Sequence, residues 1–291
     1  MKKGVLYGLA FLGGVFLFLL LVGFLVSFLV GLRSHGASFR EAIGVVEIKG
    51  IITEADEKIR ILEDFLYQRE IKAVVVRIDS PGGTVGASQE LYEELRRVAA
   101  RKPVVVSMGS VAASGAYYVA LGGTRIVASP GTITGSIGVI LQVPNLKKLL
   151  QKIGVEPVVL KSGRFKDILS YYRSPNAEER KILEGALSEI HRQFMRAVAE
   201  SRGLKLDRVR EIADGRIFTG EKARELGLVD ELGNFAEAVE EAARLAHIKG
   251  RPRLVYGRRK KPWWRMFFEG RERLSLENLL TSPLYLWMAG A

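Results

Sequence analysis

The sequence predicts an α/β fold in which helices cover both faces of a mainly parallel sheet. Short runs of Val and Ile, such as residues 73–78 and 104–108, have no polar alternation, which is typical of strands buried on both faces. Segments with helical periodicity separate these runs, and the alternation of strand and helix favours parallel pairing. A chain of 291 residues is long enough for one large domain with appendages.

The first half of the body carries the clearest alternation. It predicts strands at 45–48, 73–78, 104–108 and 125–128, and helices at 56–68, at 87–101 and directly after Ser114. The second half predicts helices at 146–153, 177–202, 208–213, 220–226 and 235–246, with one strand at 157–160. We expect the body to occupy residues 42–250.

The N-terminal segment is the longest apolar run of the chain. No charged residue occurs between Val5 and Leu32, and a helix of that length, at about 1.5 Å per residue, exceeds a hydrocarbon core of about 30 Å. A cleaved secretory signal is the alternative, but its apolar region is shorter, and residues 34–38 form a poor cleavage site. We therefore expect a transmembrane anchor at 5–32, a cytoplasmic N-terminus at 1–4 and a linker at 33–41, with the body outside the cytoplasmic face.

Charge is concentrated at the two ends of the chain. Of the net charge of +12, residues 1–40 carry +4 and residues 251–291 carry +6, which leaves +2 on the body. A nucleic-acid-binding protein would carry its basic surface on the folded core, so we expect no nucleic-acid partner and favour a lipid bilayer. The absence of cysteine excludes disulfides, thiolate metal sites and cysteine nucleophiles.

The C-terminal tail, residues 251–291, mixes cations with large aromatic residues. Arg258 to Phe268 contains two Trp and two Phe among Lys and Arg, a composition suited to a membrane interface. Packing on the body or on a neighbouring subunit is an equal alternative.

Ser114 lies where a buried strand passes through small residues into a helix, in Gly109-Ser-Val-Ala-Ala-Ser-Gly-Ala116. Such a turn displays a hydroxyl, and the free N–H groups of the following helix can face the group that the serine attacks. The three histidines, His35, His191 and His247, are all distant from it in sequence. If Ser114 is a nucleophile, lysine is the expected base.

Two further segments offer what acyl transfer requires. Asp79-Ser-Pro-Gly-Gly83 ends a buried strand, and its glycines allow backbone N–H groups to approach a ligand. Lys161-Ser-Gly-Arg-Phe-Lys-Asp167 contains Lys166 beside Phe165, where a low-dielectric setting would favour the neutral amine that a base must be. Lys161 is the rival base within this segment.

Together with Pro130-Gly-Thr-Ile-Thr-Gly-Ser-Ile-Gly-Val139 and Ala213-Asp-Gly-Arg-Ile-Phe-Thr-Gly220, these segments resemble the signal peptide peptidase A family in its short, single-copy form. The resemblance covers about residues 43–247. It implies a Clp-protease/crotonase-like fold and a membrane-anchored serine endopeptidase with a Ser/Lys dyad.

The resemblance assigns roles to five residues. Ser114 is the expected nucleophile, Lys166 the general base, and Gly83 and Gly115 the oxyanion-hole residues. Ser136 is expected to orient the lysine amine. The resemblance also favours Lys166 over Lys161, since Lys166 precedes Asp167. No metal or cofactor is expected for this chemistry.

The family also implies the biological setting. We expect hydrophobic peptides as substrates, above all remnant signal peptides, a single-pass protein of the cell membrane, and a homo-oligomeric ring in which serine and lysine can come from adjacent subunits. Two alternatives are an acyl-CoA-processing enzyme of the crotonase type and a catalytically inactive membrane scaffold. The presence of both Ser114 and Lys166 argues against each of them.

Overall fold

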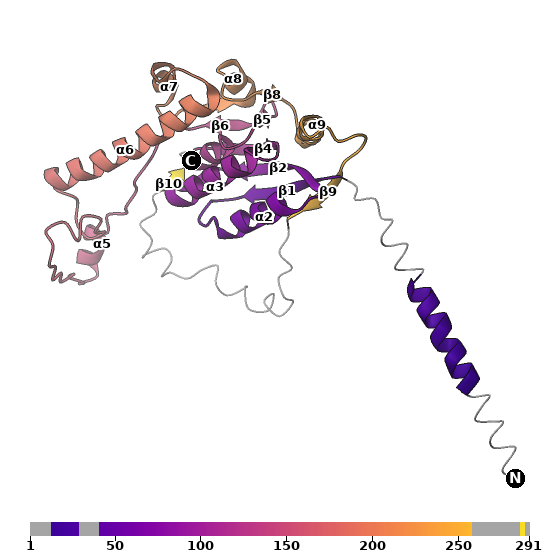
Figure 1. Ribbon diagram of the computed structural model, residues 1–291. Coiled ribbons are helices and arrows are strands. Elements are labelled where there is room, and N and C mark those ends of the chain that lie inside the picture. The colour runs from indigo at the N-terminus through magenta and orange to yellow at the C-terminus, as the bar shows by residue number, and fades with distance from the viewer. Residues whose placement is uncertain (1–12, 29–40, 258–285, 289–291) are drawn as a thin grey trace, which may run out of the picture. The chain divides into compact units, whose positions relative to one another are not determined.

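The computed structural model describes residues 13–28, 41–257 and 286–288 of a chain that divides into two units, Met1–Glu41 and Ala42–Ala291 (Figure 1). In the first unit, residues 13–28 form one helix. Within the described residues, no helix has both the length and the apolar character needed to cross a membrane. The anchor predicted at 5–32 extends beyond this helix at both ends, into residues outside the described part of the chain.

The second unit is built on one eight-stranded sheet. Its strands are β1 (Ala42–Lys49), β2 (Ile71–Ser80), β4 (Val104–Ala113), β5 (Arg125–Ala128), β6 (Ile133–Gly135), β7 (Ile217–Thr219), β8 (Glu231–Leu232) and β9 (Arg253–Tyr256). The main path runs β7-β6-β4-β2-β1-β9, and β5 joins β4 to β8 beside it. All pairings are parallel except that of β6 with β7, which confirms the predicted α/β class.

Helices cover both faces of this sheet because consecutive residues of its central strands are apolar. Along β2, Val74, Val76 and Ile78 belong to the larger core, which includes α2 (Asp56–Tyr67), α3 (Val85–Ala99) and α4 (Gly115–Ala120). Ala73 and Val75 point the other way and pack with α9 (Phe235–Leu245). The sheet is therefore buried on both sides, as continuous Val/Ile strands require.

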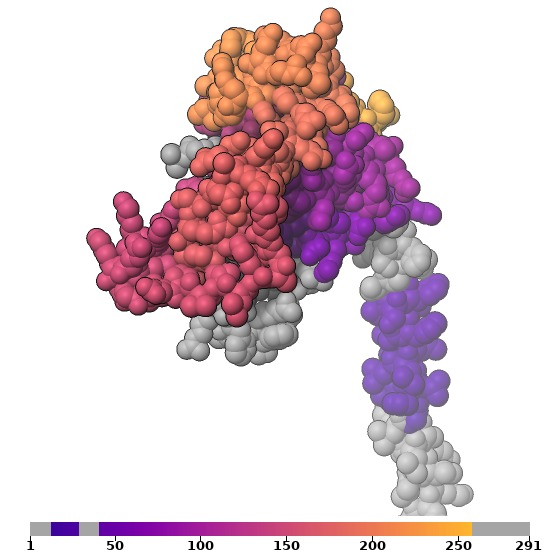
Figure 2. All heavy atoms as spheres, turned by 90° about the vertical axis from the view of Figure 1, so that its left-hand side faces the viewer, coloured from indigo at the N-terminus to yellow at the C-terminus, as the bar shows by residue number. Residues whose placement is uncertain are grey.

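An arm projects from this body (Figures 1 and 2). It consists of residues 139–176, including α5 (Lys147–Lys152), and the first half of α6 (Ala177–Arg202). The second half of α6 buries Phe194 and Val198 in the body, and α7 (Leu206–Ile212) and α8 (Gly220–Glu225) follow it. The strand predicted at 157–160 is absent, and Val158 and Leu160 are 86% and 95% exposed.

The C-terminal part of the chain differs from the predicted layout in two places. Strand β9 pairs with β1, so residues 253–256 of the predicted tail belong to the sheet. Strand β10 (Leu286–Met288) pairs antiparallel with β3 (Gly82–Thr84), so these three residues lie on the body. The basic aromatic segment at 258–268 lies outside the described residues.

Candidate active site

Ser114 occupies a sharp turn between β4 and α4. Its backbone has φ 54° and ψ −123°, a strained conformation for a residue with a side chain. The residue is 1% exposed, and within the described part of the chain its Oγ is one of two buried side-chain polar atoms without a hydrogen-bond partner. The other atom is His191 Nε2. A strained, buried and unpartnered hydroxyl is typical of a nucleophile that awaits its base and substrate.

Small residues allow strand β6 to approach the Ser114 turn at hydrogen-bonding distance. The pair Ala113 and Gly135 is in register between β4 and β6, and the N–H of Ser114 donates to the Gly135 carbonyl at 2.8 Å. Gly135 has φ 80°, and a Cβ there would lie 2.6 Å from the Phe218 ring. The glycine is therefore required both for its conformation and for the close approach.

Ser136 follows Gly135, and so lies beside Ser114 at the ends of adjacent strands. It is 5% exposed with φ 50°, and its N–H donates to the Arg216 carbonyl at 2.9 Å. The structure thus brings together the predicted nucleophile and the predicted lysine-orienting hydroxyl.

Gly83 lies in β3, which contacts α4. On one edge of β3 the carbonyl of Gly82 accepts from the N–H of Ile52 at 2.9 Å, and the N–H of Thr84 donates to the Ile52 carbonyl at 2.7 Å. Because successive N–H groups of a strand alternate in direction, the N–H of Gly83 faces the opposite edge. Trp287 of β10 pairs with Gly83 on that edge, which shows that the edge accepts an extended antiparallel strand.

Gly115 is the first residue of α4, directly after Ser114. Its N–H therefore has no acceptor within the helix. Gly83 and Gly115 come from elements that contact each other next to Ser114, an arrangement compatible with a two-donor oxyanion hole.

Lys166 lies on the arm rather than in the body. It is exposed, and its amine makes no hydrogen bond or ion pair with any described residue. The low-dielectric setting expected from Phe165 is therefore not present within the single chain. Four of the five predicted site residues come together in the body, and Lys166 is held apart from them.

Lys161 has a different role from Lys166 in this structure. Its Nζ donates to Asp167 Oδ1 at 2.5 Å, and Arg173 Nε donates to Asp167 Oδ2 at 3.0 Å. The bonds from Arg173 and then from Lys161 hold the pKa of the Asp167 carboxyl well below its usual range. Lys161 is thus engaged in an ion pair, which leaves Lys166 as the free amine of this segment.

Tyr117 anchors α4, the helix that follows Ser114, to the interior of the body. It is fully buried, and its hydroxyl donates to the Leu228 carbonyl at 2.9 Å. Burial raises the pKa of the Tyr117 phenol, so the hydroxyl stays protonated and remains a donor. It braces α4 and is not positioned as a base.

Two residues that support the arm were not identified from the sequence. They are Arg173 and Glu179, which form a bidentate ion pair at 2.6 and 2.7 Å. The pattern Asn176-x-x-Glu179 before a helical run is a capping-box signal, and it could have directed attention to Glu179. Nothing in the local sequence indicates the partner of Glu179. Among the described residues, no cluster of His, Asp or Glu could hold a metal ion.

A strained serine between a strand and a helix, beside a glycine-rich strand edge and on this α/β scaffold, defines a serine peptidase of the ClpP/crotonase type. The sequence profile named Clp protease matches residues 50–132, and the profile named Peptidase family S49 matches residues 96–249. The chain belongs to peptidase family S49, whose members use a Ser/Lys dyad, and it is a signal-peptide-peptidase-like serine protease.

Three relatives illustrate the range of this family. The Synechocystis sp. protein slr0021, whose name classes it as a protease, is 46% identical over 211 residues, covering 72% of this chain and 76% of that protein. The chloroplastic serine protease SPPA of Arabidopsis thaliana is 35% identical over 214 residues, covering 73% of this chain and 32% of that protein. An Enterococcus faecium protein named as a signal peptide peptidase SppA is 36% identical over 180 residues, covering 62% of this chain and 52% of that protein.

Proposed function

We propose that this protein is a membrane-anchored endopeptidase that cleaves hydrophobic peptides, in particular remnant signal peptides, with Ser114 as nucleophile and Lys166 as general base. The observation that carries the proposal is the buried, unpartnered Oγ of Ser114 beside a strand edge that accepts an extended chain. A peptide bound antiparallel on β3 would place a carbonyl group near both the Oγ and the Gly83 N–H.

The reaction follows from this placement. Lys166 Nζ takes the proton from Ser114 Oγ as the oxygen attacks the peptide carbonyl carbon, and the N–H groups of Gly83 and Gly115 donate to the oxyanion. The C–N bond then breaks, and the leaving amine takes its proton from the lysine ammonium. A water molecule, deprotonated by the same amine, hydrolyses the acyl-enzyme and releases Ser114. The Ser136 hydroxyl is suited to accept a hydrogen bond from the lysine during these transfers.

The separation of Lys166 from Ser114 supports a base supplied by an adjacent copy. The lysine is exposed on an arm, whereas the serine is buried in the body and has an open hydrogen-bonding position. In a ring of identical chains, each arm could bring its lysine to the Ser114 of the next copy. The single-pass anchor at 5–32, the cytoplasmic N-terminus and the extracytoplasmic body are part of the same proposal, and they rest on the uncharged run and the charges before it.

The chemistry is tested with a fluorophosphonate probe and a fluorogenic apolar peptide. We expect Ser114→Ala to abolish labelling and cleavage, and Lys166→Ala to abolish cleavage at neutral pH. Labelling that survives Ser114→Ala would contradict the nucleophile assignment, and wild-type cleavage by Lys166→Ala would contradict the dyad.

The origin of the lysine is tested by mixing the two inactive variants after dissociation and reassembly. If the base comes from a neighbouring copy, mixed assemblies contain sites with an intact Ser114 and an intact Lys166, so cleavage returns. If both residues of a site come from one chain, the mixture stays inactive.

A further inference from the structure

The arm has almost no hydrophobic core of its own. Between residues 138 and 193, every one of which the structure describes, Glu179 is the one residue that is buried. Its side chain is 2% exposed although it lies in the exposed half of α6. A buried carboxylate in a segment without buried apolar residues needs a specific partner, and that partner is Arg173.

Arg173 links Asp167 to the first turn of α6 through its planar guanidinium group. Its Nη1 and Nη2 donate to the two Glu179 oxygens, its Nε donates to Asp167 Oδ2, and its Nη2 also reaches the Asp167 carbonyl at 3.2 Å. Glu179 in turn accepts from the Asn176 N–H at 2.8 Å as part of the helix cap. Both the side chain and the main chain of Asp167 are thereby fixed to the first turn of α6.

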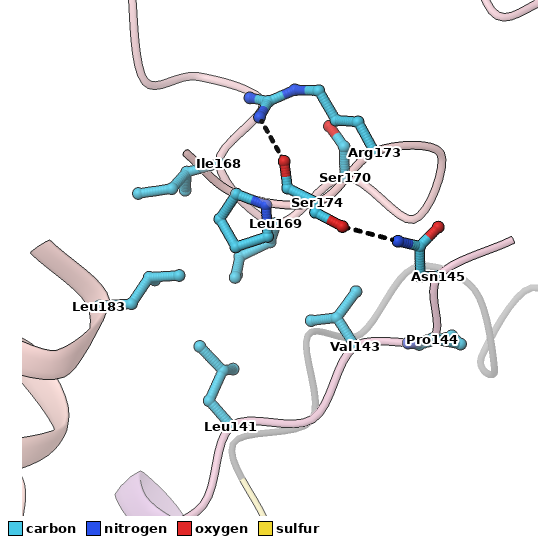
Figure 3. A pocket seen from close by; sticks show the side chains of 11 residues that line it. Leu141, Val143, Pro144, Asn145, Ile168, Leu169, Ser170, Arg173, Ser174 and Leu183 are labelled. Atoms are coloured by element: carbon cyan, nitrogen blue, oxygen red, sulfur yellow. Dashed lines mark hydrogen bonds between the residues drawn. The ribbon is translucent and has the colours of Figure 1, made fainter. Parts of the chain in front are cut away.

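Apolar packing alone does not hold this loop. The residues after Asp167, Ile168 and Leu169, line a pocket of about 270 Å³ together with Leu141, Val143 and Leu183 (Figure 3). The pocket leaves the loop only partly packed on that side, so its position depends on the polar contacts of Arg173.

We propose that Arg173 is a positioning residue for catalysis, which fastens the Lys166 loop to α6 and keeps the Asp167 carboxylate from pairing with the Lys166 amine. The inference rests on the proposed function, in which Lys166 is the base. Asp167 is the next residue after Lys166, and its two oxygens accept from Arg173 and Lys161. A carboxylate whose two oxygens are engaged in this way is not available to pair with the neighbouring Lys166 amine, which therefore stays free.

The charged groups nearest to Lys166 along the chain lie in residues 161–173, and the first turn of α6 adds two acidic residues. The loop contributes Lys161, Arg164, Asp167 and Arg173, and α6 contributes Glu178 and Glu179. Arg164 pairs with Glu178, and both side chains are largely exposed, at 70% and 49%. Lys161 and Arg173 both bond to Asp167, but of these groups only Arg173 also bonds to the buried Glu179 carboxylate.

The test compares three variants of the full chain in detergent micelles, with kcat/KM for an apolar peptide measured as a function of pH. Arg173→Gln removes both the planar guanidinium group and its charge, so we expect kcat/KM to fall by about 10²-fold. We also expect the acid limb of the pH profile to shift to higher pH, because the released Asp167 carboxylate then stabilises the lysine ammonium. Arg173→Lys keeps the charge without the planar fork, so we expect a smaller fall and an acid limb that stays in place. Arg164→Gln removes an exposed cation from the same loop and should change neither quantity.

Thermal unfolding of each variant separates positioning from stability. A fall in activity that matches a loss of folded protein, with the acid limb unmoved, would make Arg173 a stabilising residue only and overturn the proposal. Wild-type values for Arg173→Gln would also overturn it. If instead the assignment of Lys166 as general base is wrong, Lys166→Ala will cleave the peptide with either Arg or Gln at position 173, which distinguishes that outcome from failure of the present proposal.

Discussion

Replacement of Gly83 by Ala tests the oxyanion hole at its most constrained position. A Cβ at Gly83 would lie 1.9 Å from the Ile52 carbonyl oxygen, 2.5 Å from its carbon and 2.6 Å from its nitrogen. All three atoms belong to the backbone of a residue that is paired with β3, so none of them can rotate away as a side chain could. The strand carrying the Gly83 N–H has to move instead.

The size of that movement sets the expected effect. Ordinary contact begins at 3.4 Å, so the oxygen and the new methyl group must separate by about 1.5 Å. An oxyanion donor acts from 2.7–3.1 Å, and a displacement of ~1 Å can cost about 10²-fold in rate. Loss of one donor costs about 10²- to 10³-fold in kcat, or ~3–4 kcal/mol of transition-state stabilisation. We expect Gly83→Ala to lower kcat by at least that factor.

A neighbouring glycine provides the control. Gly86 lies three residues further along, in α3, and a Cβ there meets nothing within 4 Å. Gly86→Ala should therefore retain wild-type kcat and stability, while Gly83→Ala loses activity with its fold retained by circular dichroism. A Gly83→Ala variant with wild-type kcat would refute the placement of the oxyanion donor on β3.

Three further predictions concern the elements around the site. Tyr117→Phe removes the buried donor to the Leu228 carbonyl, so we expect the free energy of unfolding to fall by about 1–3 kcal/mol, measured by urea titration, with Ser114 still labelled by the probe. The bidentate bond from Arg173, followed by the Asn176 N–H, lowers the pKa of Glu179 from 4.5 to about 2. The ionised Glu179 therefore stabilises the first turn of α6 fully above pH 4.5, and this stabilisation is lost as the pH falls toward 2. Hydrogen exchange in that turn should detect the loss, and Glu179→Gln should abolish the pH dependence. Removal of residues 284–291 deletes β10 and frees the outer edge of β3, so kcat/KM for short peptides should rise several-fold; an unchanged value would show that β10 does not compete with substrate.

Much of the body could be predicted from local sequence because its strands are apolar along their whole length. The Val runs of β2 and β4 and the strand at 125–128 were predicted, and α6 has both of its predicted bounds. The capping box at its start and the left-handed Gly203 at its end explain why that helix was so well defined. β4 continues five residues beyond its predicted end at Met108, through the small residues that lead to Ser114.

The remaining elements depend on partners that are distant in sequence. Strands β3, β6, β7 and β8 are two or three residues long and exist only through pairing, so no periodicity could reveal them. The apolar residues 157–160 show the converse case: they have strand-forming character, but no neighbouring strand is present in the arm. In the proposed assembly the setting of Lys166 belongs to the same class, because contacts with another copy are not encoded in a local sequence pattern.

The division of the proposed dyad between body and arm has a consequence for regulation. Ser114 is held between β4, most of whose residues are buried, and α4, all of whose residues are buried. Lys166 is held by a segment with one buried residue, whose order rests on the ion pairs of Arg173. Perturbations that leave the body folded can therefore move the base while the nucleophile stays in place. If the base comes from an adjacent copy, as proposed, a chain that has not assembled has a strained serine without its base, and peptide cleavage is then confined to assembled copies.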